Sequence, residues 1–246
     1  MADTSLGALS EFIDSLREVE TLLAAAPSQP LGDGSVSRQS HNRDLVNAVN
    51  RSAMVMLVAH FEGFVKSALT ELIDEISEAE PPTRRLPEGL LELHTRERIQ
   101  EIFGTAGPDR IHKTRRLFSA YASLWDSDRT VNPRILSARV LTRQFTNARP
   151  EVLDSVFSIL DVQDVLATMD AHVNQAIMDR GDSATRVKVS VKLEEIVNRR
   201  NKIAHGDKSE KPTRFEVEGH LSFLKDVAEC LAQVLQQTIN RCCSLR

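Results

Sequence analysis

The sequence predicts an all-α protein, on three observations. Of the 246 residues, 41% are hydrophobic and 27% are charged, as in ordinary globular proteins. Ten Gly and nine Pro are fewer than a turn-rich β fold would carry. Apolar residues recur at helical spacing, and the alternation typical of strands is confined to residues 187–191. We expect a single helical domain over residues 1–246 with a mainly aliphatic core, because Phe, Trp and Tyr make up only 4%.

The first two helices have the clearest apolar faces. The first is expected over residues 5–25 and is followed by a Pro- and Gly-containing loop at 27–34. The second is long, 43–76, and Pro81-Pro82 ends its segment. Gly63 interrupts this helix at a cost of about 1 kcal/mol relative to alanine. We therefore expect another helix to approach closely at Gly63.

Shorter helices are expected over 88–103, 113–125, 133–145, 150–160 and 161–178. Asn132-Pro133 and Arg149-Pro150 resemble helix entries with proline in the first turn. The stretch 187–191 is interpreted as an extended lead-in, with Ser190 capping the following helix. The last helix opens at Thr213, where Glu216 three residues later predicts a capping box.

The helix after Ser190 carries an arginine on its apolar face. The stripe passes through Arg200 and is defined by Leu193, Ile196, Val197, Ile203 and Ala204. A guanidinium cannot be buried without a partner, so Arg200 either pairs with a core carboxylate or faces an anion-binding cleft. His205 ends the helix before Gly206, a natural C-terminal stop. The helix dipole alone favours a histidine there, by about 0.3–1 kcal/mol.

Arg200 and His205 are offset by about 140° on a regular helix. They share a face only if the helix loosens at its end, which we expect Gly206 to allow. Asn201 lies one turn before His205 and shares its face, where it can orient the imidazole or contact a phosphate. An arginine for an anion and a histidine for a proton are the minimum needed to cleave RNA, although this spacing also arises by chance.

Two segments resemble a known superfamily. Residues 200–206, Arg-Asn-Lys-Ile-Ala-His-Gly, resemble the Arg-x(4–6)-His signature of the HEPN superfamily. Residues 58–66, Val-Ala-His-Phe-Glu-Gly-Phe-Val-Lys, resemble the long-helix motif of the larger bacterial HEPN families, the RiboL-PSP type and its relatives from toxin–antitoxin and defence loci. The two matches follow in order along the chain and leave most of residues 80–180 uncovered.

This resemblance implies a HEPN-like helical bundle with additional helices that forms a homodimer, with the site residues of both protomers in a shared cleft. It implies a metal-independent endoribonuclease that cleaves RNA through attack of the 2′-OH and leaves a 2′,3′-cyclic phosphate. Arg200 and His205 are then the catalytic residues. The expected supporting or RNA-binding residues are Asn201, Arg199, Lys202 and Glu62. Glu62 alternatively forms a surface pair with Lys66, one turn away.

The implied biological role is that of a toxin or an antiviral, phage-defence effector, with a cognate antitoxin as partner. The alternative is a catalytically inactive HEPN module that binds nucleotide or scaffolds a protein. A third interpretation is a helical interaction protein with a chance motif.

Charge and composition limit the kinds of partner that we expect. The net charge of −4 argues against a generic nucleic-acid coat, but residues 184–215 hold nine Lys or Arg against four Asp or Glu. A local basic patch on an acidic chain favours a defined anion site. Residues 110–116 form a second basic cluster, either a solvated helix start or an RNA contact. No metal-ligand spacing, cofactor motif, secretion signal or apolar run of about 20 residues is present, so we expect a cytoplasmic protein without metal or membrane contact.

Overall fold

The computed structural model describes residues 6–26, 36–126, 129–181 and 186–244. These residues form helices and no strand, which confirms the all-α prediction. The nearest approach to a sheet within them is an isolated antiparallel bridge between Pro82 and Thr130. The predicted loop at 27–34 lies outside the described residues.

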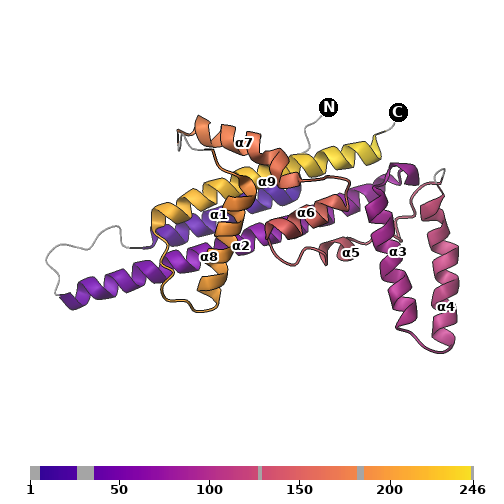
Figure 1. The fold of residues 1–246 in the computed structure, drawn as a ribbon, viewed down its shortest axis with the longest axis horizontal. Helices are drawn as coiled ribbons and strands as arrows, with labels where there is room; N and C mark the ends of the chain where they lie inside the picture. The colour runs from indigo at the N-terminus through magenta and orange to yellow at the C-terminus, as the bar shows by residue number, and fades with distance from the viewer. Residues whose placement is uncertain (1–5, 27–35, 127–128, 182–185, 245–246) are drawn as a thin grey trace.

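Three long helices form the bundle. They are α1 (Gly7–Ala24), α2 (Val36–Ala79) and α9 (Arg214–Cys243), and they run side by side (Figure 1). The apolar face of α2 is fully buried between α1 and α9 at helical spacing, at Met54, Leu57, Phe61, Val65, Leu69, Leu72 and Ile76. By length and composition alone the segment 42–79 could cross a membrane, but half of its most apolar window is buried in this core. The core contacts explain its hydropathy.

The α9 helix begins as the sequence predicts. The Thr213 hydroxyl accepts the backbone N–H of Glu216 at 3.2 Å, and the Glu216 carboxylate accepts the backbone N–H of Thr213 at 2.7 Å. This reciprocal capping box satisfies two of the donors that a helix start leaves open. It fixes where the chain turns into α9.

A second group of helices lies against one side of the bundle. It contains α5 (Ala138–Thr142), α6 (Pro150–Ser158), α7 (Val165–Asp179) and α8 (Val189–Ala204), and α8 crosses α2 (Figure 1). The predicted helix 133–145 was too long, because the backbone N–H of Ser137 leaves the helical pattern to donate to His94 Nε2 at 3.0 Å. The predicted helix 161–178 was also too long at its start, since Asp161 and Asp164 have positive φ values of 60° and 49°.

The start of α8 differs from the expectation. Ser190 lies inside the helix, and its side chain caps nothing. Asp170 of α7 supplies the cap instead, since its carboxylate accepts the backbone N–H of Val189 at 2.8 Å. The Asn174 amide bonds both backbone groups of Val187, at 2.7 Å each. The segment before α8 is thus held by side chains of α7. The local sequence around Ser190 gives no sign of these contacts.

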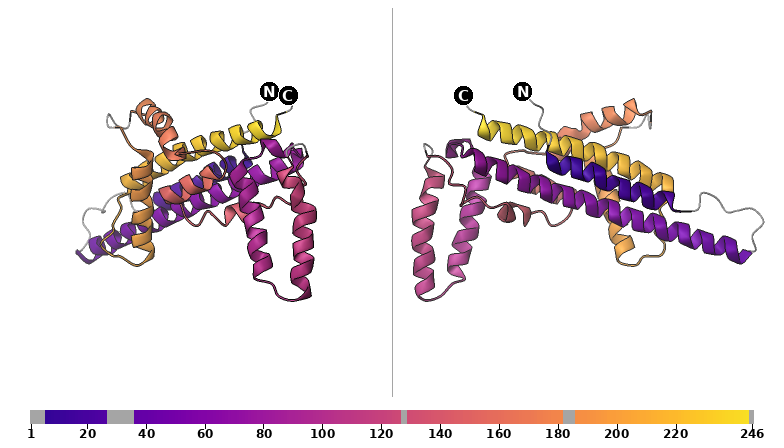
Figure 2. Two further views of the ribbon diagram at one scale, coloured as in Figure 1. Left: turned by 45° about the vertical axis from the view of Figure 1, so that its right-hand side comes forward. Right: turned by 180° about the vertical axis from the view of Figure 1, so that it is seen from behind.

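The remaining helices form a hairpin that stands off the bundle (Figure 2). It consists of α3 (Glu88–Phe103) and α4 (Pro108–Arg116), and α4 continues into a π-helical turn (Leu117–Tyr121) and a 3₁₀ turn (Ala122–Trp125). A short 3₁₀ turn (Thr83–Arg85) leads into α3. The bounds predicted for α3 are confirmed. The helix predicted over 113–125 begins earlier, because Gly107 at φ +70° and Pro108 at the first helical position start α4.

Candidate functional site

Arg200 pairs with a carboxylate from the long helix. Its Nη2 donates to Glu62 Oε1 across 138 residues of sequence, joining α8 to α2. The same oxygen accepts the backbone N–H of Ala148 at 3.2 Å. Both charged side chains are 21% exposed, so the pair lies at the edge of the core. Of the two predicted environments for Arg200, the structure shows the ion pair, and Glu62 pairs with Arg200 rather than with Lys66.

The guanidinium of Arg200 is held by Glu62, but some of its N–H donors have no described acceptor. A guanidinium has five N–H donors, and the pair with Glu62 uses only Nη2. The Nε of Arg200 is buried and finds no acceptor among the described residues. An unsatisfied buried donor costs about 1–3 kcal/mol. Because Nε is enclosed, an anion would have to approach the 21% of the side chain that remains exposed, while Glu62 holds the guanidinium from the other side.

His205 lies at the end of α8 on another face. The helix stays regular there, because the backbone N–H of His205 donates to the Asn201 carbonyl at 2.9 Å. The chain turns only afterwards: Gly206 has φ +85°, and the N–H groups of Gly206 and Asp207 bond the carbonyls of Ile203 and Lys202 at 3.0 Å each. This is a Schellman ending. The expected loosening before His205 is wrong, and the angular offset from Arg200 remains.

The imidazole is exposed and bonds no other described residue. Its helix face continues one turn back to the half-buried side chain of Asn201, which also lacks a described hydrogen bond. Further back on the same face lie Asn198 and Glu194, since the four residues follow each other at steps of four, three and four. The structure therefore brings Asn201 and His205 together, as predicted, and leaves both available to a ligand.

A second arginine contacts this face. Arg149, at the start of α6, pairs with Glu194 at 2.8 Å and donates to Asn198 Oδ1 at 3.2 Å. Asn198 in turn donates to Glu194 at 2.8 Å. Arg149 follows Ala148, which contacts Glu62, so one turn of chain links the Arg200 face of α8 to the His205 face. Sequence reasoning missed Arg149 because only Pro150 marked this segment, as a helix start.

The other predicted supporting residues have different surroundings. Arg199 pairs with Glu210 at 2.7 Å and with Glu216 at 2.9 Å, and its side chain is only 17% exposed. The backbone N–H of Thr213, aided by Arg199, lowers the pKa of Glu216 to about 2. Arg199 thus joins α8 to the start of α9. Lys202 is 59% exposed and lies 3.9 Å from Glu210, so its ammonium is available at the surface.

The loop after His205 is held against α2 by hydrogen bonds. Arg51 Nη1 donates to the carbonyls of Asp207 at 2.5 Å and Glu210 at 2.7 Å, and Asn50 Nδ2 donates to the carbonyl of Pro212 at 3.0 Å. A groove of about 460 Å³ runs beside this contact, lined by Ala48, Arg51, Ser52, Val55, Met56 and Ile203. The α2 helix therefore supports both the Arg200 pair and the segment next to His205.

Gly63, beside Glu62, faces open space. A Cβ added there meets no atom within 4 Å, and the residue is exposed. The expectation that another helix approaches Gly63 is therefore wrong for the described residues of one chain. The surface next to Glu62 is left free for a second molecule.

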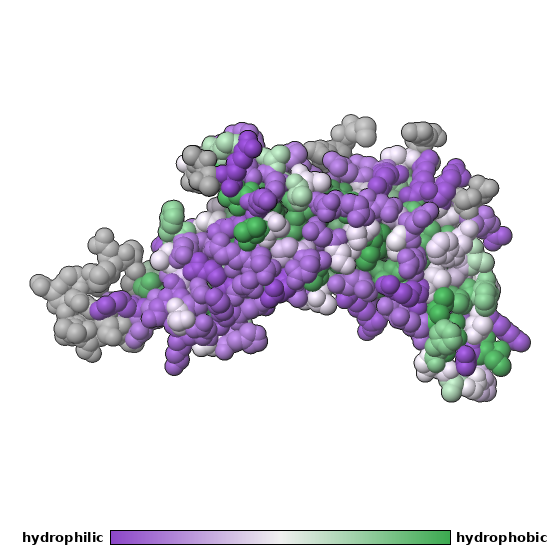
Figure 3. Space-filling model, in the orientation of Figure 1, coloured by the Kyte–Doolittle hydropathy of each residue, from purple (hydrophilic) through white to green (hydrophobic). Residues whose placement is uncertain are grey.

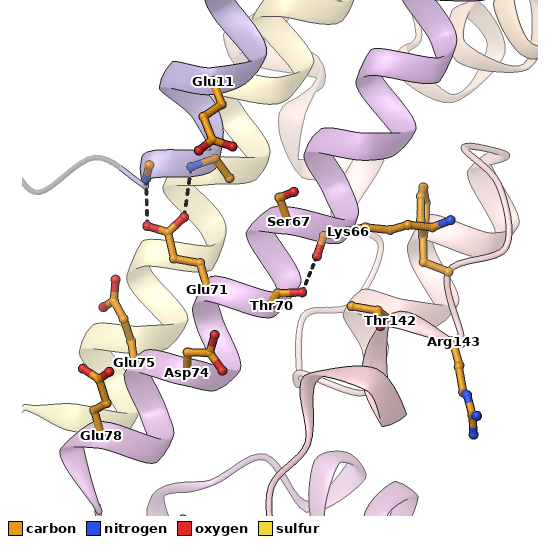
Figure 4. Close-up of a pocket in the computed structure, with 13 residues that line it drawn as sticks. Glu11, Lys66, Ser67, Thr70, Glu71, Asp74, Glu75, Glu78, Thr142 and Arg143 are labelled. Atoms are coloured by element: carbon orange, nitrogen blue, oxygen red, sulfur yellow. Dashed lines mark hydrogen bonds between the residues drawn. The ribbon is translucent and has the colours of Figure 1, made fainter.

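A wider groove, of about 950 Å³, lies elsewhere. It runs along α1, α2 and α5 and is lined by the acidic side chains of Glu11, Glu71, Asp74, Glu75 and Glu78 (Figure 4). Glu71 caps α1 by accepting the N–H groups of Gly7 at 2.7 Å and Ala8 at 3.0 Å. Burial and the neighbouring Glu71 and Glu78 raise the pKa of Glu75. A phosphate would be repelled here, so this groove is not the anion site. The described residues contain no group of three His, Cys, Asp or Glu side chains placed to hold a metal ion.

Comparison with known proteins identifies the family of the chain. The model of the RiboL-PSP-HEPN family matches residues 10–237. No curated protein and no solved structure gives a match. The matched segment contains α2 and α8 and thus both Arg200 and His205. Because the match extends over most of the sequence, the chain belongs to the RiboL-PSP-HEPN family.

Proposed function

We propose that this protein is a metal-independent endoribonuclease of the HEPN type. The observation that carries the proposal is the state of two side chains on α8. Arg200 is held by Glu62 through Nη2, and 21% of its side chain stays exposed. His205 is exposed at the helix end without a described partner. We infer that Arg200 binds a phosphate and that His205 exchanges a proton, and family membership supports the same activity.

The reaction needs no nucleophile from the protein. The 2′-OH of RNA attacks the adjacent phosphorus, so the O2′–P bond forms and the P–O5′ bond breaks. His205 takes or relays the proton of the 2′-OH, and the departing 5′ oxygen receives a proton in exchange, from the imidazolium or from water. Arg200 stabilises the charge that develops on the phosphoryl oxygens, and Glu62 holds the guanidinium in position. The products are a 2′,3′-cyclic phosphate and a 5′-hydroxyl.

A homodimer is part of the proposal. Within one chain, the regular end of α8 keeps Arg200 and His205 on different faces. Two copies related by a two-fold axis can bring the Arg200 and His205 side chains of both into one cleft. The open surface at Gly63, beside Glu62, offers a place for such a contact. We propose that the dimer acts as a toxin or phage-defence effector controlled by a cognate antitoxin.

Cleavage of a labelled RNA in EDTA tests the activity. We expect the wild type to cut, and Arg200→Ala and His205→Ala to be inactive while remaining folded dimers. Arg17→Ala and His172→Ala are matched controls, because both residues are exposed and lie on other helices. Replacing the scissile 2′-OH by hydrogen should stop cleavage. Strict dependence on magnesium, cleavage of DNA, or full activity of either site variant would refute the mechanism.

The ion pair also favours a second candidate. Arg200 is already neutralised by Glu62, as in a catalytically inactive module that binds a nucleotide or a protein. In that case the wild type would cut no RNA, and ATP or another nucleotide would still bind with an affinity that Arg200→Ala lowers. Calorimetric titration with ATP separates this candidate from the nuclease.

A further inference from the structure

The α3–α4 hairpin carries most of the exposed large hydrophobic side chains. Nine such residues are exposed among the described ones, and five of them lie between residues 99 and 125. Figure 3 shows this hydrophobic surface over α3 and α4. The five are Ile99 (39% exposed), Phe103 (73%), Ile111 (60%), Phe118 (73%) and Trp125 (56%). Large aromatic residues are usually buried, so rings left outside a fold mark an interaction surface.

Cations lie between these rings. The guanidinium of Arg110 lies 5.8 Å from the ring centre of Phe103. Trp125 Nε1 donates to Thr95 Oγ1 at 3.1 Å, which positions the indole against α3 while most of it stays exposed. Residues 96–125 contain six Lys or Arg against three Asp or Glu, on a chain whose net charge is −4. This part of the hairpin, without the first two turns of α3, is therefore basic as well as aromatic.

A basic cleft of about 290 Å³ lies between α3, α4 with the turn that follows it, and residues 132–135. Its charged lining includes Arg98, Glu101, His112, Lys113, Arg116 and Arg134. Glu101, the one carboxylate among the lining residues, pairs with Arg98 at 2.9 Å and Lys113 at 3.0 Å. Arg116 and Arg134 have no described side-chain partner and are exposed. The cleft therefore keeps guanidinium groups free for a phosphate.

We propose that this hairpin binds single-stranded RNA, with bases stacked on its exposed rings and phosphates on its arginines. Rings and cations interleaved on one surface suit a single strand, whose bases are unpaired and whose backbone is anionic. A protein partner would favour a continuous apolar face, and here cations interrupt it. This inference rests on the proposed function, because it makes the hairpin the part of the nuclease that holds RNA.

The position of the hairpin fits this role. It extends to the same side of the bundle as the C-terminal end of α8 (Figures 1 and 2). Glu62 lies 17 residues before the end of α2, which leads to the hairpin. That is about 25 Å along the helix axis, or about seven nucleotides at stacked spacing. One RNA strand can thus reach from the hairpin to the Arg200 pair.

Binding is tested without cleavage in a His205→Ala background. The probe is a 5′-fluorescein-labelled 20-nucleotide uridine RNA, followed by anisotropy. We expect Phe118→Ala and Trp125→Ala each to raise the Kd about five-fold or more, because each removes a stacking platform. Arg116→Ala should lower the slope of log K against log salt concentration by about 0.7. Phe215→Ala and Arg17→Ala are matched controls, an exposed ring and an exposed arginine on other helices.

Two outcomes would overturn the inference. One is an unchanged Kd for the ring and arginine variants, with circular dichroism showing them folded. The other is a change in the mass in solution without a change in RNA affinity, which would make the hairpin a protein interface. If Trp125→Ala fails to fold, Phe118→Ala decides alone, since no described hydrogen bond depends on the Phe118 side chain. If hairpin-dependent binding is found but the wild type cuts no RNA, the proposed nuclease fails and the binding arm stands.

Discussion

Replacing Gly63 should strengthen the folded chain and weaken the proposed dimer. Gly63 lies well inside α2, where glycine costs about 0.5–1 kcal/mol relative to alanine. A Cβ at this position meets nothing within 4 Å. Gly63→Ala and Gly63→Leu should therefore raise the free energy of unfolding of the monomer by up to about 1 kcal/mol. For a chain of this size that raises Tm by about 2–4 °C.

The dimer should respond in the opposite direction. If Gly63 lies where two copies approach, a leucine overpacks the contact at a cost of about 1–3 kcal/mol. A two-fold interface counts that cost twice, so the dimer Kd should rise at least about 30-fold. The proposed RNA cleavage should fall in parallel, because the proposed shared cleft requires both copies.

Gly219 supplies the matched control. It lies inside α9, is exposed, and likewise has nothing within 4 Å of an added Cβ. Gly219→Leu should gain the same helix stability and leave the dimer and the activity unchanged. Thermal unfolding must be followed at several protein concentrations, because dimerisation itself stabilises the fold. Sedimentation equilibrium measures the dimer Kd directly.

Two results would refute this reasoning. A monomer destabilised by Gly63→Leu, while Gly219→Leu is stabilised, would show that the surface at Gly63 is not open. A Gly63→Leu protein with unchanged dimer Kd and full activity would place the interface, and hence any shared cleft, elsewhere.

Three further predictions follow from side chains of the site and the core. Mixing Arg200→Ala with His205→Ala subunits should restore part of the cleavage if the cleft needs one of each from opposite protomers, and no recovery despite measured subunit exchange would argue for separate sites. Arg200→Ala should lower the free energy of unfolding by about 1–3 kcal/mol by leaving Glu62 without its cation, and adding Glu62→Gln should recover part of that loss in a double-mutant cycle. Burial lowers the pKa of His220 from 6.5 to about 4, so the unfolded chain binds the extra proton and about 3 kcal/mol of stability is lost as pH falls through that window. Denaturant titrations at pH 7 and pH 4 should show this loss, and His220→Asn should reduce it.

Local signals predicted the fold well where the structure is decided locally. The capping box at Thr213 and the bounds of α3 depend on residues within a few positions of each other, and both are confirmed. The end of α8 before Gly206 also follows from local chemistry, since glycine accepts the positive φ of the Schellman turn. In these elements, neighbouring residues in the sequence determine the conformation.

Elements that depend on distant partners could not be predicted. Ser190 is a reasonable cap in sequence, but Asp170 reaches the same helix start from α7. The helix expected over 133–145 gives way to a bond between Ser137 and His94. In the site, the motif located Arg200 and His205, and Glu62 was identified through the resemblance. The contact of Arg149 with the His205 face joins segments far apart in sequence, and no local pattern marks it.

The long α2 helix has a consequence for how the site responds to heat. Glu62 follows Phe61, a fully buried core residue, and Arg51 of the same helix fastens the loop beyond His205. Backbone amides around Phe61 should therefore exchange with solvent only when the whole protein unfolds. The hairpin, which stands off the bundle with many exposed side chains, should exchange through local opening at lower free energy. On warming, the hairpin should therefore open before the contact between Arg200 and Glu62 is lost.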